Sequence, residues 1–197
     1  MEKVFTAEDA WYGGFHELAI ELGLRSDERV LAALNTVWSL DRIDGCFTDR
    51  GIEPSEQTKI APSLDMTGTY HGLGVAMLPN GKECACGTCV IREDGGTDWF
   101  IFYLPTGSLS YAYRIGGYPF STEAMTRPWQ EPVNEWLVTI GRAIFDVAPF
   151  EMALIGHEVS GSETASRLRE QGLPKKRYIG YLCREGTELA WYPPTHY

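Results

Sequence analysis

The feature that most constrains the fold is a stretch of alternating apolar residues at positions 67–115, interrupted by turn sequences. Apolar residues at every second position line one face of a β-strand. Two such runs meet at Pro79-Asn80-Gly81-Lys82, and Asn-Gly is the strongest short signal for a tight hairpin. The pattern therefore predicts strands that follow one another in an antiparallel meander.

The same stretch contains a second turn and a strand that is apolar on both faces. The turn is predicted at Asp94-Gly95-Gly96, and residues 99–104 then read Trp-Phe-Ile-Phe-Tyr-Leu. A strand without polar alternation suits the centre of a sheet, where both faces are covered. Residues 105–108 are predicted to turn the chain into a further strand at 109–115.

Helical periodicity precedes this block of strands. Residues 6–9 resemble a capping box, and a helical stripe follows at Trp11, Phe15, Leu18 and Leu22. A second helix is expected after Ser26, which can act as its N-cap, with a buried stripe at Val30, Leu34 and Val37. We expect the two helices to pack as a hairpin, followed by a short strand at residues 42–48.

The last third of the chain alternates between helix and strand. Pro132 suits the first turn of a long helix that Pro149 ends, and a strand is expected at residues 152–155. Ser160 or Ser162 is expected to cap a short helix that ends near Gly172. A final hairpin is predicted around Glu185-Gly186.

Together these elements indicate an α+β fold with a mainly antiparallel β-sheet meander, an N-terminal helix pair and a packed central helix. A chain of 197 residues can bury about 70% of the surface that its unfolded form exposes, so we expect a single domain over residues 1–197. The N-terminus lacks the order of a signal peptide, and no apolar run is long enough to span a bilayer. We therefore expect a cytoplasmic protein that does not enter the membrane.

The charge of the chain bears on its partners. The net charge is −10, and phosphate binding is driven by lysine and arginine, so nucleic acid is not expected as a direct ligand. The charge favours a basic partner, although acidity can also serve solubility alone.

Three of the five cysteines, Cys84, Cys86 and Cys89, fall close together. A structural zinc ion needs four ligands, and this chain offers no second cysteine pair. On a strand Cys84 and Cys86 share one face while Cys89 points to the other, so the three thiols converge only if the strand bends. We favour cysteines acting as small apolar residues and no cofactor, with zinc as the alternative.

Residues 156–162 read Gly-His-Glu-Val-Ser-Gly-Ser and lie at a predicted strand-to-helix junction. Backbone amides at such a junction can hold an anion, but the lysine of a phosphate-binding loop is missing. His157 with Glu158 or Ser160 could transfer protons if the fold brings them together. This junction is the candidate site of an alternative reading as a small enzyme.

The order of elements, with the phrase Ile-Gly-x-Glu-x-Ser-Gly over residues 155–161, resembles bacterial immunity proteins of the polymorphic toxin systems. The resemblance implies a non-enzymatic, acidic binding protein that neutralises a cognate basic toxin, often a nuclease, by occluding it. It transfers no catalytic residue.

Two kinds of side chain are candidates for binding such a partner. Aromatic residues near an exposed end are common anchors of protein interfaces, although this tail can equally pack on its own domain. Acidic clusters can steer a basic protein, although each can also be a solvated loop. The predicted partner-binding residues are Asp41, Asp44, Asp49, Glu93, Asp94, Asp98, Trp191 and Tyr192.

Overall fold

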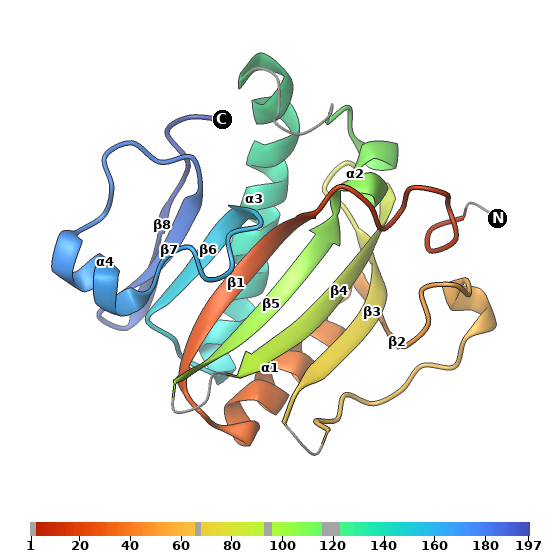
Figure 1. Cartoon of the computed structure of the whole chain (residues 1–197), viewed down its shortest axis with the longest axis horizontal. Helices are drawn as coiled ribbons and strands as arrows, with labels where there is room; N and C mark the ends of the chain where they lie inside the picture. Colours follow the sequence, from red (N-terminus) through yellow and green to blue (C-terminus); the bar gives the residue numbers. More distant parts are fainter. Residues whose placement is uncertain (1–2, 66–67, 93–95, 116–122) are drawn as a thin grey trace.

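The structure is a computed structural model that describes residues 3–65, 68–92, 96–115 and 123–197. In these residues one sheet contains all eight strands, in the order β2-β3-β4-β5-β1-β6-β7-β8, and every neighbouring pair is antiparallel (Figure 1). The strands are β1 (Phe15–Leu24), β2 (Ile43–Phe47), β3 (Tyr70–Met77), β4 (Glu83–Arg92), β5 (Thr97–Pro105), β6 (Met152–His157), β7 (Gly180–Glu185) and β8 (Glu188–Tyr192). The helices are α1 (Asp27–Trp38), α2 (Thr106–Ala112), α3 (Glu123–Val147) and α4 (Ala165–Gln171), with a 3-10 turn at Pro54–Glu56. The α+β class with a mainly antiparallel sheet is therefore confirmed.

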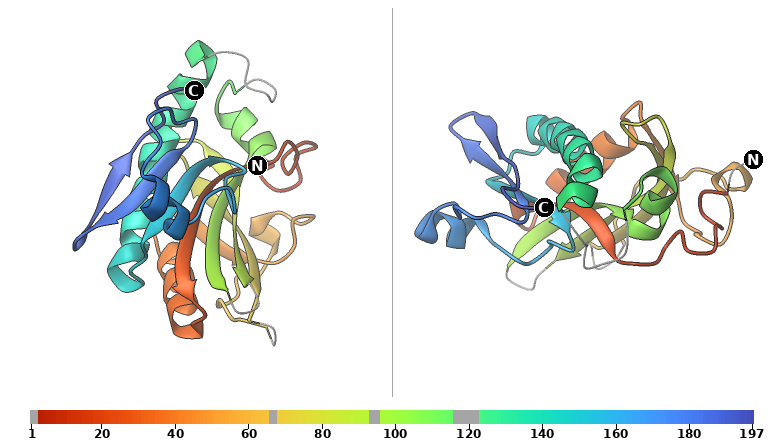
Figure 2. Two further views of the ribbon diagram at one scale, coloured as in Figure 1. Left: turned by 60° about the vertical axis from the view of Figure 1, so that its left-hand side comes forward. Right: turned by 90° about the horizontal axis from the view of Figure 1, so that it is seen from above.

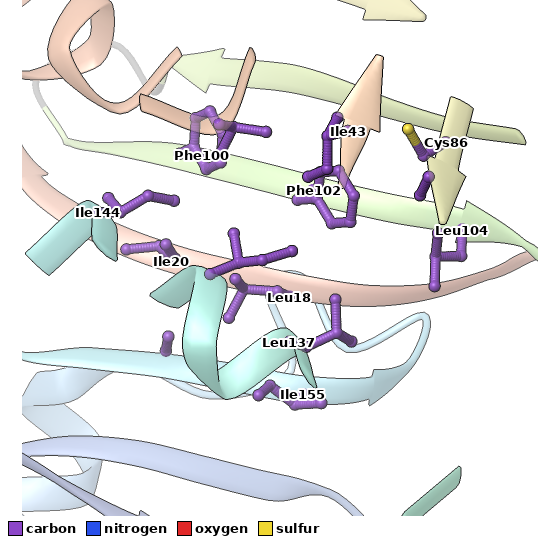
Figure 3. Packing of buried hydrophobic residues seen from close by; sticks show 14 of the residues in the cluster. Leu18, Ile20, Ile43, Cys86, Phe100, Phe102, Leu104, Leu137, Ile144 and Ile155 are labelled. Carbon is purple, nitrogen blue, oxygen red and sulfur yellow. The ribbon is translucent and has the colours of Figure 1, made fainter. Parts of the chain in front are cut away.

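Helices α1 and α3 lie side by side against one face of the sheet, and α4 lies on the opposite face (Figures 1 and 2). The core between the sheet and the two long helices is built from alternate strand residues. Leu18 and Ile20 of β1 and Phe102 of β5 point toward Leu137 and Ile144 of α3, and all are fully buried (Figure 3). This layer supplies most of the apolar burial that stabilises the fold.

The predicted first helix is wrong, and with it the N-terminal helix pair. Residues 15–24 form β1, the central strand, which pairs with β5 on one side and β6 on the other. Two residues of the stripe that suggested a helix, Leu18 and Leu22, also form a two-residue period with Ile20, and all three are buried on the helical face. Gly13 and Gly14 adopt positive φ angles of 84° and 78°, which end any helical continuation before the strand.

Three other predicted boundaries are corrected. Residues 106–112 form α2, where a turn at 105–108 and a strand at 109–115 were predicted. The amides of Thr106 and Gly107 at its start bond the carbonyls of Gly14 and Tyr12. Helix α3 runs through Pro132 from Glu123, so this proline does not mark its start. Helix α4 is capped by Thr164, whose hydroxyl accepts from the Arg167 amide at 3.3 Å, and not by Ser160 or Ser162.

Several predictions are confirmed. Ser26 is the N-cap of α1 and accepts from the Arg29 amide, and the stripe Val30, Leu34, Val37 is buried. β3 and β4 form the hairpin at Asn80-Gly81, and β7 and β8 form the last one. The turn predicted at 94–96 lies largely outside the described residues.

Aromatic rings cover glycines near both edges of the sheet. A Cβ added to Gly74 of β3 would lie 2.4 Å from the Trp38 ring, and one added to Gly180 of β7 would lie 2.0 Å from the Trp191 ring. Glycine leaves a strand surface that a large ring can fill. These contacts explain why strands otherwise rich in apolar residues contain glycine at these positions.

Candidate functional site

The first acidic cluster lies beside edge strand β2. Asp41, Asp44 and Asp49 are all exposed. Asp44 pairs with Lys59, and the Asp49 carboxylate accepts from the Gly51 amide at 2.8 Å, which shapes the loop. Two of the three acids therefore already have partners within the chain.

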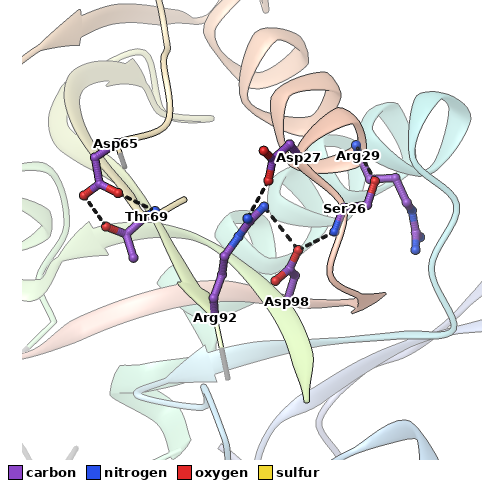
Figure 4. A network of polar contacts seen from close by, with 7 residues as sticks. All are labelled: Ser26, Asp27, Arg29, Asp65, Thr69, Arg92 and Asp98. Carbon is purple, nitrogen blue, oxygen red and sulfur yellow. Dashed lines mark hydrogen bonds and ion pairs between the residues drawn. The ribbon is translucent and has the colours of Figure 1, made fainter. Parts of the chain in front are cut away.

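The second acidic cluster does not form an exposed face. Asp98 is only 2% exposed, and its carboxylate lies 3.3 Å from the Arg92 guanidinium and accepts from the Ser26 amide at 2.9 Å (Figure 4). Arg92 also reaches Asp27 at the start of α1. Asp98 thus ties β5 to the N-cap of α1 and is unable to contact a partner. Glu93 and Asp94 lie outside the described residues.

The two predicted aromatic anchors lie on β8, at the far edge of the sheet. Both side chains are half-buried and face opposite sides of the strand. The Trp191 indole donates to Glu135 of α3 at 2.8 Å, and the Tyr192 hydroxyl donates to Glu185. Part of each ring therefore packs on its own domain, as the alternative reading of the tail anticipated, and part remains open to solvent.

A groove of about 230 Å³ opens beside this hairpin, between α4 and the sheet. Leu168 and Leu173 line one wall, and Met152, Cys183 and Tyr192 line the other. Charged residues also line the groove: Glu151, Arg169, Arg184 and Glu185. An apolar floor with a charged rim is the usual composition of a site that takes a side chain from a partner.

The three clustered cysteines do not converge. Cys84 and Cys86 are fully buried on the helical face of β4, whereas Cys89 packs on the opposite face. Burial raises the pKa of the Cys84 thiol to about 12 and that of Cys89 to about 11. Within the described residues no group of three or more histidine, cysteine or acidic side chains is placed to hold a metal ion.

The 156–162 junction is held in place by two carboxylates of β1. Glu17 is 4% exposed and accepts from the Ser160 amide at 2.6 Å, while Glu21 accepts from the Ala165 amide at the start of α4. Burial raises the pKa of Glu17. Glu158 has a φ of 47°, an unusual conformation for a residue with a side chain. The junction is thus a hydrogen-bonded turn with a strained backbone at Glu158.

A buried polar cluster that the sequence reasoning missed lies at the same end of the sheet. His16 is fully buried, and its Nε2 lies 2.7 Å from Oδ1 of Asn134 on α3. Because the amide oxygen only accepts, Nε2 carries the proton, and burial lowers the pKa of His16 to about 4. Its register partner on β6 is His157, whose pKa is also lowered by burial.

A sequence signal for this cluster exists on α3. Thr126, Gln130 and Asn134 recur at every fourth position and are all buried. A polar stripe on a helix normally faces solvent, so one inside an apolar helix indicates polar partners opposite it. The Nδ1 of His16 and the Nδ2 of Asn134 have no hydrogen-bond partner among the described residues.

No family model, no curated protein and no solved structure matches the chain. Among the described residues, no helix combines the length and the apolar character that crossing a bilayer requires.

Proposed function

We propose that this chain is a non-enzymatic binding protein that neutralises a cognate basic toxin by covering it. The observation that carries the proposal is the β7–β8 hairpin, which combines an edge strand, half-exposed aromatic rings and an adjacent groove. Binding energy at protein interfaces concentrates in such aromatic anchors and the pockets beside them. The phrase at residues 155–161 that resembles immunity proteins supports the same class of function, whereas the N-terminal helix pair that was part of the resemblance is replaced by β1 and a single helix.

The charge of the chain supports a basic partner. A net charge of −10 accelerates encounter with a basic protein over distances of about a Debye length, roughly 10 Å at 0.1 M salt. Exposed acids lie at both edges of the sheet, with Asp41 and Asp49 near β2, and Glu185 and Glu188 at the tip of the β7–β8 hairpin. We place the binding surface at the second edge, where the acids lie beside an open strand, half-exposed aromatic rings and a groove.

The direct test is co-purification of the tagged chain with the protein encoded next to it in the native host, followed by a growth assay of that protein's toxicity. We expect a stoichiometric complex, protection of the cells, and an affinity that falls as salt rises from about 0.05 to 0.5 M. Leu168→Lys narrows the groove and should weaken the complex. Asn35→Lys, on the exposed face of α1, is the charge-matched control. A neighbouring protein that neither binds nor becomes harmless would contradict the proposal.

A second candidate function is favoured by the His16 and His157 pair. Two neutral imidazoles on paired strands, with Glu158 next to one of them, could transfer protons in a small enzyme. His157→Gln separates the two readings because this change keeps a polar side chain but removes the titrating group. Under occlusion this variant should bind and protect like the wild type, whereas under catalysis it should bind but no longer protect.

A further inference from the structure

Strand β8 has an open edge. It pairs with β7 over five register pairs from Glu185–Glu188 to Tyr181–Tyr192, and no strand of the described residues pairs with its other side. Figure 2 shows the hairpin standing out from the body of the molecule at the end of the sheet. An edge of this kind exposes backbone N–H and C=O groups that another chain can use.

The hairpin geometry identifies which backbone groups are available. Gly186 and Thr187 make a two-residue turn, so the flanking pair Glu185–Glu188 exchanges hydrogen bonds, and bonded and non-bonded pairs alternate from there. Leu189 and Trp191 therefore direct their N–H and C=O groups away from β7. These two residues offer an extended chain two donors and two acceptors.

The edge lacks most of the devices that prevent such pairing. Natural edge strands are protected by proline, lysine, a bulge or a covering loop. The register of β7 and β8 has no bulge, and the sequence Glu-Leu-Ala-Trp-Tyr contains neither proline nor lysine. The glutamate at its first position is the single charge on the strand.

The charges at the tip of the β7–β8 hairpin favour an added strand with basic side chains. Glu185 and Glu188 are exposed and lie directly opposite each other across the two strands, and like charges in this position repel. Arg184 does not neutralise them, because its guanidinium bonds Glu151 at 3.1 Å and the Gly186 carbonyl at 2.9 Å. A basic side chain on an added strand would relieve this repulsion.

We infer that β8 is the docking edge for an extended segment of the partner, which adds to the sheet as a ninth strand and carries lysine or arginine opposite the tip. This inference rests on the proposed function and names its mode of recognition. Main-chain hydrogen bonds to Leu189 and Trp191 give affinity, and an apolar side chain beside Tyr192 enters the groove. A second copy of this chain fits less well, because it brings another net charge of −10 and its own Glu188 to the same edge.

A matched pair of variants isolates the backbone contribution. Leu189→Pro removes an outward N–H and blocks the approach of a strand while leaving the bonds to β7 in place, and Leu189→Ala removes the same side chain but keeps the N–H. With the neighbouring protein as the probe, we expect Leu189→Pro to weaken the complex at least about tenfold relative to Leu189→Ala. Circular dichroism and urea unfolding establish that both variants are folded.

Two further measurements make the outcome unambiguous. A capped octapeptide of alternating lysine and valine should slow hydrogen exchange at the Leu189 and Trp191 amides, and one of alternating glutamate and valine should not. Equal affinity of the proline and alanine variants for the neighbouring protein would overturn strand addition but leave the proposed function intact. Absence of binding to the wild type would instead refute the proposed function. A wild-type dimer in light scattering that Leu189→Pro dissociates would assign the edge to self-association and overturn the inference.

Discussion

The two edges of the sheet differ in how their backbone is covered. At β2, the amide of Ile60 in the following loop bonds the Cys46 carbonyl at 3.0 Å, and Lys59 of the same loop pairs with Asp44. At β8, no comparable segment of the described residues bonds the outer side of the strand. Within the described residues, a loop of the chain therefore bonds to the β2 edge, whereas the outer side of β8 stays open.

The comparison teaches that exposed acids alone do not identify an interface. Asp44 and Asp49 at the β2 edge are engaged within a loop that already occupies the strand. At the β8 edge Glu185 accepts from the Tyr192 hydroxyl, but it lies opposite Glu188 beside an open backbone and a groove. The same residue type belongs to a structural loop at β2 and, in the proposed function, to the binding surface at β8.

The largest expected effect is a loss of stability at low pH that originates at the centre of the sheet, in β1. His16 has a pKa of about 4 in the fold and 6.5 when unfolded, so the unfolded chain takes up a proton that the folded chain resists. Its contribution to stability is complete above pH 6.5 and is lost as pH falls toward 4, a change of about 3 kcal/mol. Urea unfolding at several pH values measures this slope.

His16→Gln provides the control for this acid effect. The raised pKa of Glu17 opposes the histidine, because a folded carboxyl that binds protons more readily gains stability as pH falls, and this contribution is present in both proteins. The difference between wild type and variant therefore isolates His16. Parallel pH profiles would show that the histidine does not remain neutral in the fold.

The next effect compares the glycines beneath the two tryptophans. A Cβ at Gly74, near the β2 edge, would meet the Asp44 backbone oxygen at 2.6 Å as well as Trp38. A Cβ at Gly180 would meet the half-exposed Trp191 ring, which can swing outward. We expect Gly74→Ala to lower the free energy of unfolding by about 3 kcal/mol and Gly180→Ala by about 1 kcal/mol.

Removal of the ring is the control for the glycine comparison. In a Trp191→Ala background, Gly180→Ala should have almost no further cost, because the obstructing atoms are gone. If the two alanine substitutions lowered the free energy of unfolding equally in the wild type, the Trp191 ring of β8 would be held as firmly as the Trp38 ring near β2. The distinction between the two edges would then fail.

The elements that the sequence predicted are those with local signals. Ser26 caps α1 as expected, Asn80-Gly81 closes its hairpin, and the β7–β8 hairpin was predicted around Glu185-Gly186. Each depends on contacts between residues near one another in the chain. Such contacts are encoded in short stretches, and cap and turn motifs reveal them.

The wrong predictions concern residues whose structure is determined by contacts with distant parts of the chain. β1 reads as a helix, but its stability comes from strands that pair with it from residues 97–105 and 152–157. His16 and Asn134 are 118 positions apart, so no local pattern joins them. Asp98 resembles a surface acid until the position of Arg92 is known. Non-local pairing overrides local propensity at these positions.

A third test compares the thiols near the two edges. Cys46 of β2 is buried and bonds the Tyr70 hydroxyl, whereas Cys183 of β7 is half-buried with a pKa raised to about 11 by burial. The thiolate is the reactive form, so alkylation of Cys183 by iodoacetamide should rise about tenfold per pH unit from pH 7 to 10. We expect peptide mass spectrometry to find Cys183 modified in the folded protein and Cys46 modified only in urea. Equal rates at neutral pH would show that the β2 edge opens as readily as β7.

The smallest expected effect distinguishes the two contacts that the loop makes with β2, the ion pair of Lys59 with Asp44 and the backbone bond of Ile60 to Cys46. The side chains of Lys59 and Asp44 are 54% and 58% exposed, so their ion pair is screened by solvent, and Lys59→Ala should cost less than about 0.5 kcal/mol. Ile60→Pro removes the amide that bonds Cys46, and we expect it to cost about 1 kcal/mol more than Ile60→Ala in urea unfolding. A larger loss from Lys59→Ala than from the proline would mean that charge, and not the backbone bond, closes this edge. The contrast with β8, where we propose that a partner supplies the backbone bonds, would then lose its basis.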